Sequence, residues 1–301
     1  ANELLLGDGA GVITASSSLP GGSANTYSIG LGDVNQDGHL DIVVGNKVGA
    51  NELLLGDGAG GITANRSLPG GSAMTYSIAL GDVDEDGHLD IVVGNHAAAN
   101  ELLLGDGAGG ITTISSLPGG STNTYSIALG DVDEDGHLDI VVGNSAAANE
   151  LLLGDGAGGF MASSSLPGGS PFTYSIALGD VNQDGHLDIV VGNSKMFAAT
   201  NELLLGDGAG GFTSSSTFPV DSADTRSIAL GDVNQDGHLD IVVGNSWNPY
   251  VPGNSAAANE LLLGDGAGGF TASSLCQASS SLCGGSANTK SIALGDVNQD
   301  G

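Results

Sequence analysis

Nine-residue acidic segments recur along this chain with a composition that suits a calcium ion. The first copy is Asp33-Val34-Asn35-Gln36-Asp37-Gly38-His39-Leu40-Asp41, and complete copies return at 82–90, 131–139, 180–188 and 232–240, with a sixth beginning at Asp296. Positions 1, 3, 5 and 9 carry side-chain oxygen atoms, position 6 is a glycine that permits a sharp turn, and position 7 offers its backbone carbonyl. Because Ca²⁺ takes six to eight oxygen ligands at about 2.3–2.6 Å, this spacing predicts a calcium loop in each copy.

The predicted ligands are the side chains at positions 1, 3, 5 and 9, together with the histidine at position 7 through its backbone carbonyl only. They are Asp33, Asn35, Asp37, His39, Asp41, Asp82, Asp84, Asp86, His88, Asp90, Asp131, Asp133, Asp135, His137, Asp139, Asp180, Asn182, Asp184, His186, Asp188, Asp232, Asn234, Asp236, His238, Asp240, Asp296, Asn298 and Asp300. Five Ca²⁺ sites are complete, and a sixth would form if the chain continues or is complemented by another chain. The loops of 82–90 and 131–139 contain an extra Asp-Glu pair, so we expect them to hold the ion most tightly. The histidine rings are expected to be solvated.

The first six positions also fit the EF-hand pattern, but the rest of the segment does not. An EF-hand requires a bidentate glutamate at position 12 and a helix on each side. Position 12 is a valine in all five complete copies, at 44, 93, 142, 191 and 243. The loop continues into Asp-Ile-Val-Val-Gly, which is typical of a strand. The pattern therefore indicates a calcium loop between two strands.

The elements that must position these loops form a longer repeat. Gly-Asp-Gly triplets have their Asp at 8, 57, 106, 155, 207 and 265, at spacings of 49, 49, 49, 52 and 58 residues. Each unit predicts four short strands, which in the second unit are 76–83, 90–94, 100–105 and 110–115. A four-strand unit of this period indicates a β-propeller blade. We expect an all-β protein, a single domain over 1–301, with about six four-stranded blades, or seven if the chain is incomplete.

On these residues the chain resembles the FG-GAP/VCBS repeat family, whose blades build integrin-type propellers. The resemblance is carried by Gly-Asp-Val-Asn-Gln-Asp-Gly-His-Leu-Asp-Ile-Val-Val at 32–44 and Asn-Glu-Leu-Leu-Leu-Gly-Asp-Gly-Ala-Gly-Gly at 51–61, and it extends over six copies. It implies calcium in the loop between the first two strands of each blade. The family includes adhesion receptors, secreted lectin-like modules and enzyme accessory domains, so the resemblance leaves the function open.

The two ends of the repeat predict how the ring would close. The N-terminal hairpin, residues 2–15, would complete the blade begun by residues 291–297, but that blade lacks a second strand. Either the chain is part of a longer polypeptide, or a neighbouring subunit supplies the strand by β-addition. The second alternative makes head-to-tail assembly of copies a hypothesis.

Composition narrows the cellular setting. The net charge is −30 with only five Lys and Arg, which argues against nucleic-acid binding. No apolar run is long enough to span a membrane. Free calcium in the cytosol is too low to fill several ordinary calcium sites, so we expect an extracellular or cell-surface protein. Cys276 and Cys283 bracket a six-residue insertion, which predicts a local disulfide, with two free thiols as the alternative.

Chemistry other than calcium binding is sparse in the sequence. We predict no catalytic residues, because the acidic residues repeat identically in every unit and no set stands apart. An insertion in the fifth unit carries Trp247 and Tyr250, candidates for contact with a partner or a sugar, although they could equally pack on a neighbouring blade. Asn65 lies in the one N-glycosylation sequon. We therefore expect a non-enzymatic, extracellular, calcium-stabilised structural or adhesive module that contacts copies of itself, other proteins or glycans. A repeating subunit of a filament or surface array is one hypothesis for such a module. The alternative is a carbohydrate-binding propeller.

Overall fold

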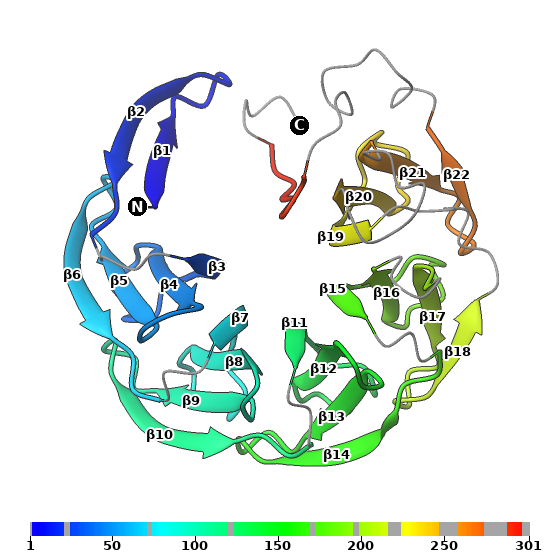
Figure 1. Ribbon diagram of the computed structural model, residues 1–301, viewed down its shortest axis with the longest axis horizontal. Coiled ribbons are helices and arrows are strands. Elements are labelled where there is room, and N and C mark those ends of the chain that lie inside the picture. The colour runs from blue at the N-terminus through cyan, green and yellow to red at the C-terminus, as the bar shows by residue number, and fades with distance from the viewer. Residues whose placement is uncertain are drawn as a thin grey trace. The chain divides into compact units, whose positions relative to one another are not determined.

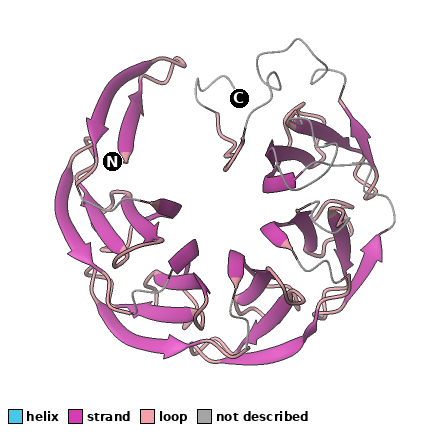
Figure 2. Ribbon diagram, in the orientation of Figure 1, coloured by secondary structure: helices cyan, strands magenta, loops and turns pink. Residues whose placement is uncertain are grey.

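The chain is built from short antiparallel strands joined by turns. The computed structural model describes residues 2–20, 25–70, 74–119, 123–168, 172–194, 199–215, 224–246, 258–273 and 288–296. Within these ranges the regular elements are strands, and no helix is present (Figure 2). The described residues accordingly contain no helix long and apolar enough to cross a membrane. The all-β expectation is confirmed.

The strands form one two-stranded sheet and five four-stranded sheets, each made of consecutive strands (Figure 1). The two-stranded sheet contains β1 (Glu3–Gly7) and β2 (Ile13–Ser18). The next two sheets contain β3 (Thr26–Gly32), β4 (Asp41–Asn46), β5 (Glu52–Gly56) and β6 (Ile62–Ser67), then β7 (Met74–Gly81), β8 (Asp90–His96), β9 (Glu101–Gly105) and β10 (Ile111–Ser116). The last three contain β11 (Thr124–Gly130), β12 (Asp139–Asn144), β13 (Glu150–Gly154) and β14 (Phe160–Ser165), then β15 (Thr173–Gly179), β16 (Asp188–Asn193), β17 (Glu202–Gly206) and β18 (Phe212–Ser215), and finally β19 (Asp224–Gly231), β20 (Asp240–Ser246), β21 (Glu260–Gly264) and β22 (Phe270–Ala272).

Each four-stranded sheet has the strand content predicted for one repeat unit, with shifted boundaries. In the second unit the first strand is Met74–Gly81, whereas the sequence predicted 76–83. It ends at Gly81 because Asp82 and Val83 already belong to the loop, where the Val83 amide donates to the Asp90 carboxylate. The second strand continues to His96, two residues beyond the predicted end.

The second and third strands pair in one register throughout. The Ile-Val-Val of each second strand lies opposite Leu-Leu-Glu of the third, as in Ile42↔Leu54, Val43↔Leu53 and Val44↔Glu52. The same register holds in the other four sheets. These second strands are buried on both faces, as expected for a sheet covered on each side by another layer.

Serine hydroxyls join the first strands of successive sheets. The amide of Ile78 donates to Ser28 Oγ, and the amide of Ile228 donates to Ser175 Oγ, each at 3.0 Å. A glycine at the same level permits this close packing. A Cβ on Gly143 would lie 2.9 Å from Thr173 Cγ2 and 3.0 Å from Ile176 Cδ1, so only a residue without a side chain fits.

The first strand carries a pairing irregularity at one residue. Its pairing with the second strand shifts between Thr75 and Ser77, which leaves Tyr76 without an opposite residue. The same shift occurs around Tyr27, Tyr174 and Arg226. Tyr76 stacks between its counterparts Tyr27 and Tyr125, with ring centroids at 4.5 and 4.6 Å. The rings of Tyr27, Tyr76 and Tyr125 thus pack on one another.

The chain divides into two compact units, each with its own core. The first comprises Ala1–Ile127, Asp155–Phe160 and Gly295–Gly301, and the second comprises Ala128–Gly154 and Met161–Leu294. The main cluster of the first unit lies between the β3–β6 and β7–β10 sheets and includes Val43, Leu53 and Ile91. Two clusters of the second unit are built in the same way from the sheets that contain β12, β16 and β20. Each of these clusters draws residues from two consecutive repeats, so a single repeat does not form a core alone.

Candidate metal centres

The predicted calcium loops connect the first and second strands of each four-stranded sheet. The glycine at position 6 has a positive φ in each, for example 94° at Gly136, and the preceding Glu134 is also left-handed with φ 58°. Position 4 adopts this conformation in all five loops, at Gln36, Glu85, Glu134, Gln183 and Gln235. The loop therefore turns sharply where the sequence predicted, and it directs the side chain at position 4 away from its own sheet.

Backbone amides hold the carboxylate at position 1 of the loop. In the third unit, Asp131 Oδ1 accepts from the amide of Asp135 at 3.1 Å and Oδ2 accepts from that of Gly136 at 3.0 Å. The carboxylate at position 5 likewise accepts from the amide at position 7, where His137 donates to Asp135 Oδ1 at 2.9 Å. These contacts fold the loop so that its carboxylates converge.

The carboxylate at position 9 is deeply buried and joins the loop to the sheet. Asp90 is fully buried, its Oδ2 accepts from the Val83 amide at 2.9 Å, and its Oδ1 accepts from the Gly105 amide at 2.8 Å. Burial raises the pKa of Asp90 from 3.8 to about 6, against the opposing effect of those two hydrogen bonds. The same pair of bonds is made by Asp41, Asp139, Asp188 and Asp240. Position 9 thus fixes the loop to the third strand, whatever else it binds.

The structure separates the five loops into two chemical classes. In three loops position 3 is an asparagine, and its Nδ2 donates to the carboxylate at position 5 at 2.8 Å, as Asn35 does to Asp37 Oδ2. That bond is the main cause that lowers the pKa of Asp37. In the other two loops position 3 is Asp84 or Asp133, and burial together with neighbouring carboxylates raises its pKa.

The two aspartate loops bring carboxylate oxygens into range of one ion. Oxygens of Asp82, Asp84 and Asp86 lie within 4.8 Å of one another, and so do those of Asp131, Asp133 and Asp139. Among the described residues, Asp82 Oδ1 and Asp84 Oδ1 are buried and have no hydrogen-bond partner. Buried, unpartnered, converging carboxylate oxygens are unfavourable without a cation, since each repels the others. This donor set consists of oxygens and fits Ca²⁺.

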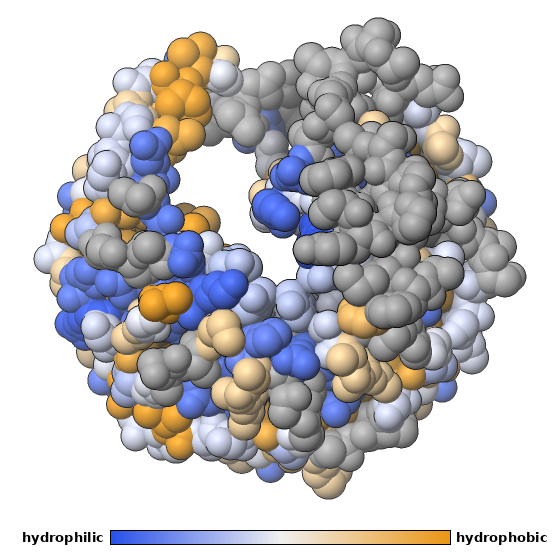
Figure 3. Space-filling model, viewed as in Figure 1, coloured by the Kyte–Doolittle hydropathy of each residue, from blue (hydrophilic) through white to orange (hydrophobic). Residues whose placement is uncertain are grey.

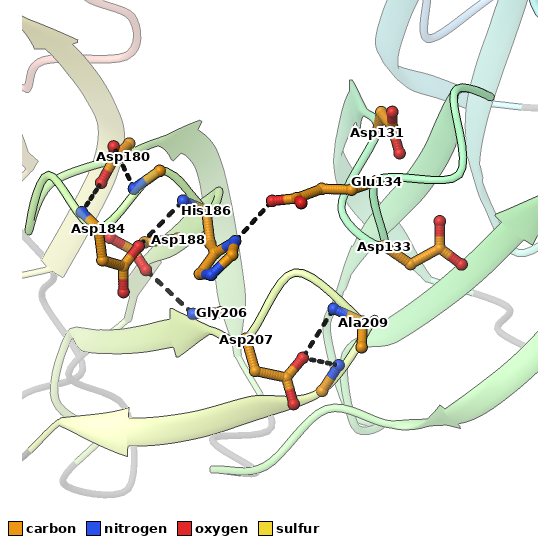
Figure 4. Close-up of polar contacts among 12 residues, drawn as sticks. Asp131, Asp133, Glu134, Asp180, Asp184, His186, Asp188, Gly206, Asp207 and Ala209 are labelled. Atoms are coloured by element: carbon orange, nitrogen blue, oxygen red, sulfur yellow. Dashed lines mark hydrogen bonds and ion pairs between the residues drawn. The ribbon is translucent and has the colours of Figure 1, made fainter.

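Side chains at position 4 link three of the loops to the loop of the next sheet. Gln183 Nε2 donates to the carbonyl of Gly237 at 2.7 Å, and Gln36 Nε2 donates to that of Gly87 at 2.6 Å. In the third unit Glu134 Oε1 lies 2.5 Å from His186 Nδ1, and Figure 4 shows the two side chains facing each other. This contact raises the pKa of His186. His186 thus contacts a glutamate that the left-handed position 4 places beside it, while the histidine side chain stays 35% exposed.

The remaining predicted site residues lie apart from these loops. Asn65 is exposed on β6, opposite Leu54. Asp296 is described and exposed. The following candidates lie outside the described residues: Trp247, Tyr250, Cys276, Cys283, Asn298 and Asp300. The metal-ligand, disulfide and glycosylation assignments stay predictions.

The sequence did not predict a buried polar cluster that lies in the second compact unit. Asp224 is fully buried, its Oδ1 accepts from Ser194 Oγ, and its Oδ2 pairs with Arg226 at 2.5 Å. Arg226 lies over the ring of Tyr174 at 3.9 Å. The signal was the arginine in place of tyrosine at the bulge, but its partner Ser194 is 30 residues away from Asp224 and could not be chosen from spacing alone.

Comparison with known proteins agrees with this architecture. The sequence model of the family described as an FG-GAP-like repeat matches residues 33–93, 82–142, 131–191 and 192–243. The chain therefore belongs to the FG-GAP-like repeat family. No curated protein sequence matches it.

Two solved structures are similar in fold. One is an Agrocybe aegerita lectin, described for its specific recognition of non-reducing terminal N-acetylglucosamine, with a TM-score of 0.58 and 19% identity over 81% of this chain and 64% of the lectin. This chain thus spans less than two thirds of that protein. The other is BBS1N in complex with ARL6DN, with a TM-score of 0.50 and 14% identity over 80% of this chain and 75% of the other. At these identities the likeness concerns the fold, and it identifies the four-stranded sheets as propeller blades.

Proposed function

We propose that this member of the FG-GAP-like repeat family is a non-enzymatic, calcium-stabilised propeller that acts outside the cell as a structural or adhesive module. One observation carries the calcium proposal, namely the buried and unpartnered Oδ1 atoms of Asp82 and Asp84 in a converging carboxylate set. Residues 82, 84, 86 and 90, with the carbonyl of position 7, would hold the ion. Calcium would neutralise the mutual repulsion of the carboxylates and hold the loop in its folded conformation.

The calcium proposal is tested by thermal unfolding with and without the ion. An ion that binds only the folded state stabilises it by about 2.7 kcal/mol per site when its free concentration is a hundred times Kd. Extracellular calcium modules have Kd values of about 10⁻⁴–10⁻³ M, so millimolar calcium should raise the melting temperature measurably. Calorimetric titration should give about five sites. A melting temperature unchanged by a chelator would contradict the proposal.

A matched pair of variants separates ion binding from general acidity. Asp84→Asn removes one converging carboxylate, so it should lower the calcium-induced rise in melting temperature. Asp106→Asn removes the same charge from an exposed turn, where Oδ1 already accepts from the amides of Ala108 and Gly110 at 2.8 and 2.7 Å. This control should leave the calcium-induced rise unchanged. Equal effects of the two variants would show that net charge alone matters.

The structural or adhesive role follows from the repetition of the blades. The aspartates at positions 1, 5 and 9 recur in all five complete loops, which supports stabilisation, because a catalytic centre requires one distinct set of residues. We propose a closed ring of six or seven blades, in which the β1–β2 hairpin supplies the third and fourth strands of one blade, and partners that include copies of this protein or other extracellular proteins. Negative-stain electron microscopy in calcium tests this directly, since rings joined head to tail would appear as filaments. Open arcs of sheets would refute the closed ring.

A carbohydrate-binding propeller is the second candidate. A cavity of about 310 Å³ lies between successive sheets of the second compact unit, and its lining includes Leu151, Ser165, Pro167 and Phe212. An aromatic ring beside a hydroxyl group is a typical setting for a sugar. A glycan array tests this candidate, and the signal should disappear with Phe212→Ala if the cavity is the site. An array without signal would exclude the lectin function for the glycans it displays.

A further inference from the structure

Two glutamines at position 4 of their loops hold the backbone of the loop in the next sheet. Gln36 and Gln183 each donate to the carbonyl of a glycine at position 6, at 2.6 Å for Gly87 and 2.7 Å for Gly237. The next residue along the chain is the histidine at position 7, whose own carbonyl is a predicted calcium ligand. Both partners of each bond lie in the same compact unit. Position 4 thus reaches the backbone directly before a predicted ligand of the neighbouring site.

Glu134 makes the corresponding link through a histidine side chain. Its Oε1 contacts Nδ1 of His186, which is position 7 of the next loop, and Figure 4 shows it extending from its own loop towards that ring. The Gly-Asp-Gly turn of the next sheet lies at the same point. A Cβ on Gly208 would lie 2.8 Å from Glu134 Oε1, and a Cβ on Gly266 would lie 2.9 Å from Gln183 Oε1. Position 4 of both loops therefore meets the turn of the next sheet as well as its loop.

Position 3 of the loop, a predicted ligand, also packs on the next sheet. A Cβ on Gly109 would lie 3.6 Å from Asn35 Cβ, and a Cβ on Gly158 would lie 3.5 Å from Asp84 Cβ. The same contact recurs at 3.5 Å for Gly210 with Asp133 and for Gly268 with Asn182. A predicted ligand and the linking residue beside it are thus both seated on the next sheet.

The links lie at the surface, where water competes with them. The hydrogen bonds of Gln36 and Gln183 are exposed. On the face that Figure 3 shows, the surface of the β3–β6 and β7–β10 sheets mixes hydrophilic and hydrophobic residues. One exposed hydrogen bond contributes little to the stability of a whole chain. A test of the links therefore has to measure the loops themselves and not only the melting temperature.

Charge by itself predicts that neighbouring calcium sites oppose each other. An ion bound in one loop repels an ion that enters the next, because like charges repel. Positive cooperativity between loops therefore requires a structural link between them. The sign of the cooperativity separates the two effects.

We propose that the residue at position 4 positions the carbonyl of the next calcium loop, so that filling one loop favours filling the next. The inference rests on the proposed function, because it takes these loops as calcium sites. Predicted ligands at positions 3 and 5 flank position 4, so an ion bound in the loop fixes the backbone between them. The fixed side chain then holds the Gly-His peptide of the next loop, which loses conformational freedom before its own ion binds. By linkage, an ion in the second loop favours the first by the same factor.

The test is a calcium titration of the full chain followed by NMR, in which the amide signals of Gly185 and Gly237 report the fourth and fifth calcium loops. Asp184→Asn weakens the fourth site, and we expect it to raise the Kd of the fifth by about fivefold or more. In the Gln183→Ala background, the same substitution should leave the Kd of the fifth site unchanged or slightly lower, because only charge repulsion remains. An equal rise in both backgrounds, or no rise in either, would overturn the inference.

Gln235→Ala is the matched control. It removes the same side chain from the same left-handed position, with φ 60° against 57° at Gln183, but from the loop that receives the link. The effect of Asp184→Asn on the fifth site should persist in this background. Its loss would show that any change at position 4 disturbs the fifth loop, and it would overturn the role of the link.

The first compact unit provides an independent measurement. Gln36→Ala and Asp37→Asn repeat the experiment there, with the amide signal of Gly87 as the report of the receiving loop, and they decide the question if variants of the second unit do not fold. Signals of the parent chain that do not respond to calcium would refute the calcium sites and the inference together. Signals that respond independently of one another would refute the link alone.

Discussion

The buried carboxylate at position 9 of the loop gives a prediction whose sign is unusual for an aspartate. Asp90 is fully buried, and burial raises its pKa from 3.8 to about 6. A rise of this size means that ionising Asp90 costs about 3 kcal/mol more in the folded chain than in the unfolded chain. In the absence of calcium, the ionised side chain therefore opposes folding at neutral pH.

Asp90→Asn removes that charge but also disturbs two hydrogen bonds. The amide can accept only one of the two backbone N–H groups, so the amide of either Val83 or Gly105 loses its partner. An unsatisfied buried N–H costs about 1–3 kcal/mol. The relief of about 3 kcal/mol and this loss nearly cancel at pH 7 without calcium. With calcium, Asp90→Asn should be clearly less stable than the parent chain, because ion binding at its loop is weakened. At a free calcium concentration a hundred times Kd, this loss of binding should lower the unfolding free energy of the variant relative to the parent by up to about 2.7 kcal/mol.

The pH dependence isolates the contribution of Asp90. Its folded pKa of about 6 lies above its unfolded value of 3.8, so the folded state binds more protons between these values. Stability from this group is therefore greatest below about pH 4 and falls by about 3 kcal/mol as pH rises to about 7. The difference in unfolding free energy between the parent chain and Asp90→Asn should change by this amount across the window.

The assay is urea unfolding of resin-stripped, calcium-free protein between pH 4 and 7.5, followed by circular dichroism. Asp106→Asn provides a control whose difference curve should be flat between pH 4 and 7.5, because the stability contributed by Asp106 changes only below this range. The amides of Ala108 and Gly110 lower the pKa of Asp106, so its contribution is present at neutral pH and is lost as pH falls through the lowered value. The unfolding free energy of the parent chain minus that of Asp90→Asn should fall as pH rises. A difference that stays flat, or that rises with pH, would refute the reasoning.

Three further outcomes follow from contacts between sheets. Gly143→Val should destabilise the chain by about 1–3 kcal/mol in urea, because the new side chain overlaps Ile176, and Gly143→Ala should have a smaller effect. Glu134→Gln should lower the pKa of His186 in an NMR titration, and an unchanged value would show that the two side chains do not meet in solution. Tyr76→Ala should cost about 1–3 kcal/mol beyond the area it buries, since it removes the contacts with the rings of Tyr27 and Tyr125, whereas a cost no larger than that of exposed tyrosines would argue against these contacts.

Much of the local structure could be predicted because each unit repeats a strong short-range signal. The Asp-Gly turns and β-branched runs predicted four strands per unit, and the structure contains them with boundaries shifted by one to two residues. The shift at Gly81 arises because the Val83 amide bonds to the distant Asp90 carboxylate instead of to a neighbouring strand. The partner of this amide depends on which acceptor is nearest in space, and the sequence pattern does not contain that information.

The loop chemistry was also readable from residue types, but its division into two classes was not. Asn35 and Asp84 occupy the same position and both offer an oxygen. Only in the folded loop does the Asn35 amide turn to the neighbouring carboxylate, while Asp84 leaves a buried oxygen without a partner. The Asn35 amide thus satisfies a carboxylate within its own loop, whereas the Asp84 carboxylate leaves its loop able to bind a cation. The role of position 4 was hidden for a related reason, because its left-handed backbone sends Glu134 to a histidine 52 residues away.

The sequence by itself determined the period, the strand content, the acidic loops and the family, because these depend on backbone preferences and residue spacing that each unit carries within itself. The tertiary structure decided which surfaces are covered. Leu5 and Leu54 have identical neighbours in sequence, yet one is half exposed and the other is buried, since among the described residues only the strand of Leu54 is paired on both edges. Burial is a property of what packs against a residue, and that partner comes from elsewhere in the fold.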